Sequence, residues 1–168
     1  MKIGLFYGSD TGNTEEVAEK IANSIGKEKV EMLSIGDASN TDIEKYDLLI
    51  FGTSTWYDGE LQSEWEDFLP NLDEIDFTDK TVALFGLGDQ FTYGDWFVDG
   101  IGIIYDIIIE KGAKVVGEWP TDEYDFDESV AERDGTFVGL ALDEDNEYEQ
   151  TDDRIERWLK LISQDFNF

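Results

Sequence analysis

The sequence predicts an α/β protein with a doubly wound parallel sheet covered by helices on both faces. Strand-like and helix-like segments alternate along its 168 residues, as in a series of βαβ units. Residues 48–52 are apolar throughout, which is expected of a parallel strand that is buried on both faces. The length suits one domain over residues 1–168, and no repeat or linker divides it.

The N-terminal third predicts a strand, a helix and a second strand, over residues 3–7, 14–25 and 30–35. Both strands are short apolar runs, whereas the helix has apolar residues at helical spacing on one face. Asn13 and Glu16 have the spacing of a capping box, which places the start of the helix. Gly26 marks its end.

The middle of the chain continues the alternation. The third strand, residues 48–52, precedes a short helix that carries apolar side chains. Ser63 and Glu66 have capping-box spacing at the start of this helix, and we expect it to end before Pro70. Residues 81–87 predict the fourth strand.

The C-terminal third predicts two helices and a divided strand. Residues 97–111 have the length of a helix, although their isoleucines would suit a strand equally well. The fifth strand begins at residues 114–116, and the apolar piece 137–142 continues it after a long inserted loop. Asp152 and Asp153 suit the first turn of the last helix because its N-terminus is partially positive.

Charge and composition exclude several classes of function. The chain has 41 acidic and 12 basic residues, so it repels nucleic acid and anionic membranes. It has no cysteine and no histidine, which excludes disulfides, thiolate chemistry, a Ser-His-Asp triad and His-ligated metals. The first residues lack the features of a signal peptide, and the most apolar stretch, residues 101–109, is too short to cross a bilayer. We therefore expect a cytoplasmic protein without membrane insertion.

The loop after the first strand has the features of a phosphate site. Its residues are Ser9-Asp10-Thr11-Gly12-Asn13-Thr14. They lead into a helix, whose first N–H groups are unpaired and attract anions. Because the loop has no Lys or Arg, it suits a bound cofactor phosphate better than phosphoryl transfer. A tight turn followed by a helix cap would explain the same residues without a ligand.

Two further loops are predicted at the same sheet edge, where doubly wound proteins bind ligands. The loop after the third strand contains the pair Trp56-Tyr57 among small polar residues, and the loop after the fourth contains glycines and Tyr93. An exposed indole is unfavourable unless a flat group covers it, although it could instead fold back onto the sheet. Together the three loops predict a slot for a planar ring with a phosphorylated tail.

The chain resembles the long-chain flavodoxins over essentially its whole length. Residues 9–14 match that family's (S/T)-x-T-G-x-T signature for the FMN phosphate. Residues 55–63 and 88–93 resemble the loops that place Trp and Tyr against the two faces of the flavin. The resemblance implies a flavodoxin-like five-stranded sheet of order 2-1-3-4-5 and FMN as the cofactor. The FMN contacts that it implies are Ser9, Asp10, Thr11, Gly12, Asn13, Thr14, Thr55, Trp56, Tyr57, Asp58, Gly59, Leu87, Gly88, Asp89, Tyr93, Trp96 and Asp145.

The resemblance also implies a function, that of a low-potential one-electron carrier and not an enzyme. Such a carrier uses the semiquinone and hydroquinone states of FMN, and the carbonyl of the Tyr57–Asp58 peptide is the expected acceptor for the flavin N5–H. The acidic surface favours basic redox partners, such as ferredoxin–NADP reductase, photosystem I or other ferredoxin- or flavodoxin-dependent enzymes. We expect the carrier to be a monomer.

Two other functions fit parts of the sequence. A phosphorelay receiver has a similar fold, but it needs an aspartate at the end of the third strand, where this chain has Thr53. It also needs an acidic pair after the first strand, where the chain has only Asp10. An FMN-dependent quinone reductase would need a basic or apolar platform for NAD(P)H, which we do not find.

Overall fold

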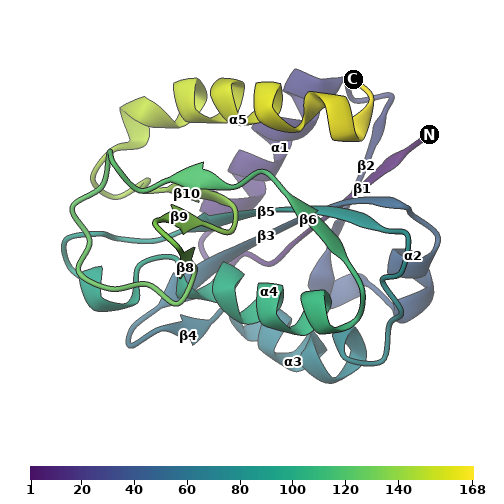
Figure 1. Ribbon diagram of the computed structural model, residues 1–168, viewed down its shortest axis with the longest axis horizontal. Coiled ribbons are helices and arrows are strands. Elements are labelled where there is room, and N and C mark those ends of the chain that lie inside the picture. Colours follow the sequence, from purple (N-terminus) through teal and green to yellow (C-terminus); the bar gives the residue numbers. More distant parts are fainter.

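A computed structural model describes all 168 residues and places a parallel sheet at the centre of the molecule (Figure 1). The main strands are β1 (Ile3–Tyr7), β2 (Val30–Ser34), β3 (Leu48–Trp56), β5 (Thr81–Leu87), β6 (Lys114–Val116) and β10 (Leu140–Leu142). They run in the order β10-β5-β3-β1-β2, and β6 pairs with the first half of the β5 edge that β10 continues. The predicted order and the interrupted fifth strand are therefore confirmed.

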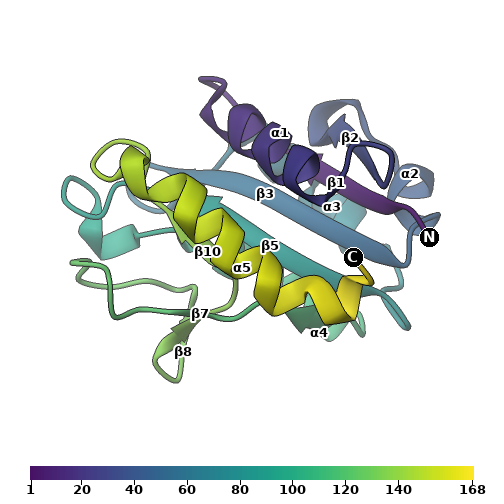
Figure 2. The same cartoon turned by 90° about the horizontal axis from the view of Figure 1, so that it is seen from above.

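Helices cover both faces of this sheet. Helices α1 (Asn13–Ile25) and α5 (Thr151–Phe166) lie side by side on one face (Figure 2), while α3 (Ser63–Leu72) and α4 (Asp99–Glu110) cover the other. The short helix α2 (Asn40–Glu44), which the sequence pattern did not indicate, precedes β3. None of the helices has the length and apolar character needed to cross a membrane.

Two tryptophans attach helices to opposite faces of the sheet. The Trp65 indole N–H on α3 donates to the carbonyl oxygen of Gly52 in β3 at 2.8 Å. The Trp158 indole N–H on α5 donates to the carbonyl oxygen of Gly117, just after β6, at 3.1 Å. Both side chains are fully buried. Since a buried indole N–H needs an acceptor, these bonds fix the positions of the two helices as well as burying apolar surface.

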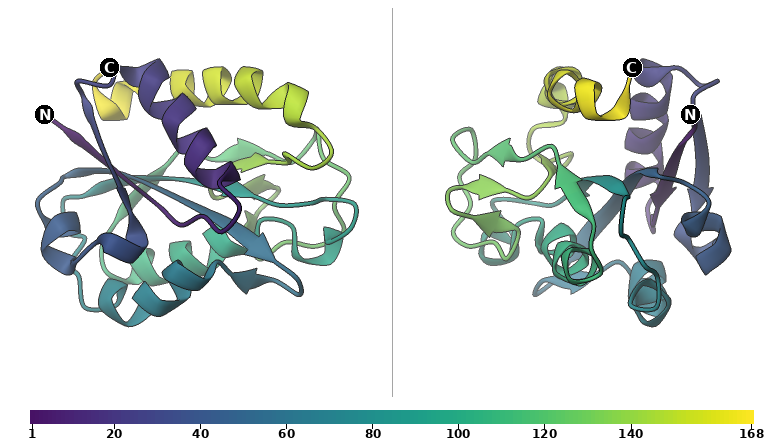
Figure 3. Two further views of the ribbon diagram at one scale, coloured as in Figure 1. Left: turned by 180° about the vertical axis from the view of Figure 1, so that it is seen from behind. Right: turned by 45° about the vertical axis from the view of Figure 1, so that its right-hand side comes forward.

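The segment inserted between β6 and β10 has a small sheet of its own. Strands β7 (Trp119–Pro120), β8 (Glu132–Arg133) and β9 (Thr136–Phe137) pair antiparallel in the order β7-β9-β8. This sheet lies beside β10, at one side of the central sheet (Figure 3). Phe137 of β9 packs with Phe97, Tyr124 and Phe126, and the ring centroids in contact are 5.1–5.8 Å apart. The sequence indicated only a polar loop with one apolar piece here.

Both predicted capping boxes are wrong. Asn13 and Ser63 are the first helical residues of α1 and α3, one position too late to act as caps. Gly12 precedes α1 in a left-handed conformation with φ of 92° and makes no side-chain cap. Gln62 precedes α3, and its side-chain oxygen accepts from the Trp65 backbone N–H at 3.1 Å.

Other element ends also differ from the prediction. Helix α3 continues through Pro70 to Leu72, although Pro70 has no N–H to donate within the helix. Strand β3 extends to Trp56, since it pairs with β5 and then with the short strand β4 (Glu60–Leu61). Helix α4 starts at Asp99 and not at residue 97, because Val98 has a left-handed φ of 49°.

Candidate functional site

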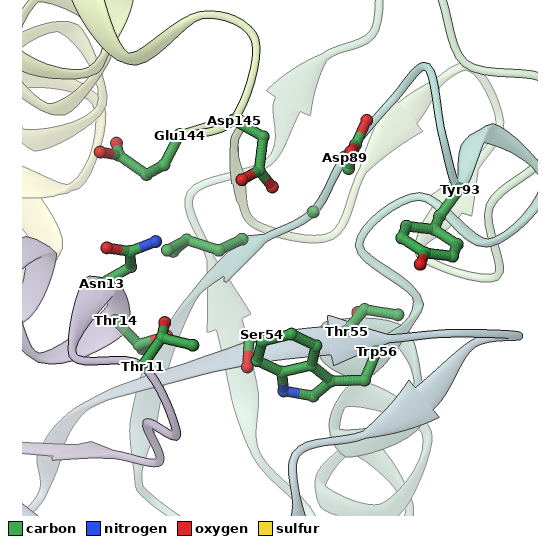
Figure 4. Close-up of a pocket in the computed structure, with 12 residues that line it drawn as sticks. Thr11, Asn13, Thr14, Ser54, Thr55, Trp56, Asp89, Tyr93, Glu144 and Asp145 are labelled. Atoms are coloured by element: carbon green, nitrogen blue, oxygen red, sulfur yellow. The ribbon is translucent and has the colours of Figure 1, made fainter.

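A cavity of about 250 Å³ opens at the carboxyl ends of β1, β3 and β5. Figure 4 shows the residues that surround it, with the start of α1 on one side and Tyr93 on the other. The lining residues are Thr11, Asn13, Thr14, Ser54, Thr55, Trp56, Leu87, Gly88, Asp89, Tyr93, Glu144 and Asp145. The three predicted loops therefore meet at one site, as expected at this edge of a doubly wound sheet.

The loop before α1 presents free backbone donors. The N–H groups of Asn13, Thr14 and Glu15 have no hydrogen-bond partner, since no side chain caps the helix. The Ser9 hydroxyl oxygen accepts from the Gly12 N–H at 2.9 Å, which closes the loop. Helical N–H groups that lack an acceptor attract an anion, so this end of the cavity suits a phosphate without any basic side chain.

Asp10 belongs to the same loop, but it points away from the cavity. Its Oδ1 accepts from the Gln62 Nε2 at 3.1 Å and from the Ser63 hydroxyl at 3.4 Å. Asp10 therefore joins the phosphate-site loop to the start of α3. This arrangement also keeps the Asp10 carboxylate away from the unpaired N–H groups at the start of α1, which attract an anion.

Two polar atoms in the wall of the cavity lack partners. The Ser54 hydroxyl oxygen and the Trp56 indole nitrogen are buried, and neither makes a hydrogen bond. Buried polar atoms without partners are rare in folded proteins because each loses its contacts with water. Trp56 lies across the floor of the cavity in Figure 4 and does not fold back into the core. Both atoms fit a site that is completed by a ligand.

A tight turn, Tyr57-Asp58-Gly59, borders the cavity without lining it. Tyr57 has a positive φ of 45° and a side chain that is 61% exposed. Gly59 has φ of 84°, and a Cβ atom placed there would lie 2.9 Å from the Trp96 ring. Trp96 therefore supports this turn from behind, which is why it does not reach the cavity.

Seven of the predicted contact residues do not line the cavity, and two lining residues were not predicted. The seven are Ser9, Asp10, Gly12, Tyr57, Asp58, Gly59 and Trp96. The additional residues are Ser54 and Glu144. Ser54 would have been found by extending β3 two residues, because alternate strand residues share a face and Trp56 was already expected at the site. Glu144 adjoins the predicted Asp145.

The cavity contains acidic side chains and no basic one. Burial raises the pKa of Asp145, and the nearby carboxylates of Asp89 and Asp143 raise it further. Asp89 behaves differently. Burial works to raise its pKa, but backbone N–H groups of the same loop and the Asn146 amide bind its carboxylate and hold the pKa below its usual value. The site therefore carries negative charge at neutral pH and disfavours the addition of an electron nearby.

Comparison with known proteins identifies relatives over nearly the whole chain. The family model "Flavodoxin" matches residues 5–158. A flavodoxin of Haemophilus influenzae is 53% identical over 161 residues, which cover 95% of this chain and 92% of that protein. A flavodoxin of a Nostoc species is 51% identical over 165 residues, covering 98% and 97% of the two chains. The crystal structure of a Fusobacterium nucleatum flavodoxin bound to flavin mononucleotide superimposes with a TM-score of 0.94 at 39% identity, covering 98% of each chain.

Proposed function

Because this chain belongs to the flavodoxin family, we propose that it binds FMN non-covalently in the cavity described above and carries single electrons between redox partner proteins. It is a carrier and not an enzyme. The bound flavin supplies the redox chemistry, since it takes up and releases electrons one at a time. We infer that residues 1–168 act as one FMN-binding domain.

One observation carries this proposal: hydrogen-bond donors that have no acceptor within the protein occur at two points of a single cavity. The free N–H groups of Asn13 and Thr14 suit the phosphate, and the unpaired atoms of Ser54 and Trp56 suit the rest of the nucleotide. The rest of the chain supplies no hydrogen-bond partner for any of these groups, so a ligand bound in the cavity could supply them. FMN has the anionic end, the polar chain and the flat ring that such a site requires.

Each part of the site has a proposed role toward FMN. The loop of residues 9–14 would hold the phosphate, and Trp56 and Tyr93 would enclose the ring. Asp145 would be near the ribityl hydroxyls. The carbonyl of the Tyr57–Asp58 peptide would accept a hydrogen bond from the ring N5–H. Tyr57 has a strained positive φ and Gly59 tolerates either sign of φ, so this turn could reorient at small cost.

The acidic lining would make the bound flavin a strong reductant. Asp89, Glu144 and Asp145 border the cavity, and no Lys or Arg does so. An electron added near these carboxylates is repelled by them, and that repulsion lowers the reduction potential. The aromatic side chains exclude water, which would otherwise screen the repulsion.

The partners would be basic redox proteins such as ferredoxin–NADP reductase, photosystem I or other ferredoxin- or flavodoxin-dependent enzymes. No Lys or Arg occurs between residues 46 and 79 or between residues 81 and 110, the segments that carry two of the three loops. Tyr57 and Phe91, each 61% exposed, belong to those loops and offer apolar contacts within an acidic surface. Such a surface steers basic proteins toward the site. We propose that the protein acts as a monomer in the cytoplasm.

Titration of the purified apoprotein with FMN tests this function. We expect one equivalent of FMN to lose its fluorescence on binding, and anaerobic reduction of the complex to proceed in two separate one-electron steps. FMN that stays fluorescent in the presence of excess protein would contradict the proposal.

A second assay separates the carrier from a quinone reductase. NADPH should reduce the FMN-loaded protein only when catalytic ferredoxin–NADP reductase is added, and the rate should fall as salt screens the acidic surface. Steady oxidation of NADPH by the protein alone would favour the quinone reductase instead.

A further inference from the structure

Gln90 connects three segments of the chain beneath the proposed FMN site. It is only 2% exposed. Its side-chain Nε2 donates to the Asp143 Oδ2 at 2.8 Å and to the Glu147 Oε1 at 2.5 Å, and its backbone N–H donates to the same Asp143 oxygen at 3.2 Å. Its Oε1 accepts from the Asp125 N–H at 2.7 Å. Gln90 therefore joins the loop after β5 to the segment after β10 and to the inserted segment.

A second set of bonds joins the same two loops closer to the cavity. The Asn146 Nδ2 donates to the Asp89 Oδ1 at 2.8 Å and to the Asp143 Oδ2 at 2.9 Å. The Tyr93 backbone N–H donates to the Asp89 carbonyl oxygen at 3.0 Å. The Asn146–Asp89 bond, between residues 57 positions apart, therefore joins the loop that positions Tyr93 to the segment that contains Asp145.

Arg154 on α5 supplies the positive charge for this network. Its side chain is 2% exposed, and its Nη2 donates to the Glu147 Oε1 at 3.3 Å. Its guanidinium also lies over the Tyr124 ring, 4.4 Å from the centroid. Without Arg154, Glu147 would lose its basic partner beside the buried carboxylate of Asp143, which would disfavour their present arrangement.

We propose that Gln90, Glu147 and Arg154 are positioning residues for the cofactor site, although none of them lines the cavity. They hold the loop of Tyr93 against the loop of Asp145 before FMN arrives. A preformed site binds more tightly because less chain entropy is lost on binding. This inference rests on the proposed function, since it concerns the affinity and potential of the same bound FMN.

Substitution of Gln90 by Met tests the proposal, because Met has a similar size and removes all three side-chain hydrogen bonds. We expect Gln90→Met and Arg154→Met each to raise the FMN dissociation constant at least tenfold, mainly through faster release. Both one-electron potentials of the FMN-saturated protein should also shift. Lys160→Met is the matched control on the same helix, since it removes one positive charge whose ion pair, with Glu156, is exposed at the surface. This control should leave the FMN dissociation constant and both one-electron potentials unchanged.

Several outcomes would decide the matter. A wild-type chain that fails to bind FMN would overturn the proposed function. Wild-type binding with unchanged affinity and potentials in Gln90→Met would overturn this inference alone, because a purely structural role changes stability but not the potentials of the saturated protein. If the variants do not fold, hydrogen exchange of the wild-type protein provides the test. The backbone N–H of Gln90, which is bonded to Asp143, should be protected from exchange equally with and without FMN. Protection of this N–H only in the presence of FMN would contradict a preformed site.

Discussion

The backbone N–H of Gly100 donates a hydrogen bond to the Thr55 side-chain oxygen at 2.8 Å. Gly100 lies in the first turn of α4, where the helix offers its own N–H groups no acceptor, and it is buried. Thr55 is the next-to-last residue of β3 and lines the cavity proposed to bind FMN. A strand residue therefore caps a helix of another segment, and this bond fixes the Thr55 side chain at the wall of the site.

We predict that Thr55→Val destabilises the apoprotein by about 1–3 kcal/mol, because it keeps the side-chain shape and leaves the Gly100 N–H buried without a partner. Urea denaturation measures this loss. Thr55→Ser retains the acceptor and should be closer to the wild-type protein in stability. An equal loss in both variants would show that the hydroxyl does not matter.

Replacement of Tyr93 by Ala should weaken FMN binding and ease its reduction. An aromatic contact contributes about 0.5–1.5 kcal/mol beyond its buried area, so we expect the dissociation constant to rise roughly tenfold. Loss of the ring would also admit water that stabilises added charge. Fluorescence titration and redox potentiometry measure the two effects. Tyr148→Ala, at a side chain that is 70% exposed and outside the cavity, is the control. Wild-type values for Tyr93→Ala would contradict the enclosure of the ring by Trp56 and Tyr93.

Neutralisation of Asp145 should raise the reduction potential of the bound FMN. One charge about 10 Å away at an effective dielectric constant near 40 costs roughly 0.8 kcal/mol, which corresponds to about 35 mV for one electron. Asp145→Asn should therefore make the potential less negative by tens of millivolts at neutral pH. Because the pKa of Asp145 is raised by burial and by Asp89 and Asp143, the difference from the wild-type protein should shrink as the pH falls.

Asp79→Asn provides the control for this charge effect. Asp79 precedes β5, at the end of the strand opposite to the FMN cavity, and its φ of 65° is one that Asn also adopts readily. The reduction potential of FMN bound to the Asp79→Asn variant should equal that of FMN bound to the wild-type protein within a few millivolts. Equal shifts in the two variants would mean that net charge, and not the acids of the cavity, sets the potential.

Asp99 should make the stability of the apoprotein depend on pH. Asp99 is 4% exposed. Burial raises the pKa of its carboxyl group above 3.8, and the Glu128 carboxylate raises this pKa further. The folded protein therefore binds this proton more tightly than the unfolded chain does. The resulting stability is present below the unfolded pKa and is lost as pH rises through the raised pKa.

The Asp99→Asn variant cannot ionise at this position, and it keeps an oxygen that can accept from the Val130 N–H, as Oδ1 does at 2.9 Å. We expect it to be more stable than the wild-type protein at neutral pH, and the two to converge in acid. Urea unfolding between about pH 3 and pH 8 would measure this difference. A variant that is less stable at neutral pH would mean that the carboxylate is favourable where it lies.

The sequence was sufficient for the features that depend on local pattern. Apolar periodicity located α1 and α5, and the continuous apolar run located β3. The capping boxes failed at Asn13 and Ser63 for different reasons. Gln62 caps α3 from one residue earlier, whereas α1 has no side-chain cap at all. The start of α1 lacks a side-chain cap where we propose that a ligand binds, and capping preferences, which reflect helix stability, are least reliable at such positions.

Contacts between distant segments could not be predicted from local pattern. Ser54 was missed because β3 was expected to stop where its apolar run stops, and the extra residues are strand only through their pairing with β4 and β5. The Gln90–Asp143 bond joins residues that are 53 positions apart. A polar side chain on a predicted loop gives no local sign that the fold will bury it.

The loop before α1 would grip its ligand with peptide groups and hydroxyls, none of which gains or loses a proton across the physiological range. At such a site, the pH dependence of phosphate binding comes from the ionisation of the phosphate itself. Carboxylates such as Asp145 would instead act on the redox-active ring. The residues that would hold the phosphate are therefore different from the carboxylates that would set the reducing power of the ring. An exchange of acids near the ring would therefore change the potential and leave the donors of the phosphate site in place.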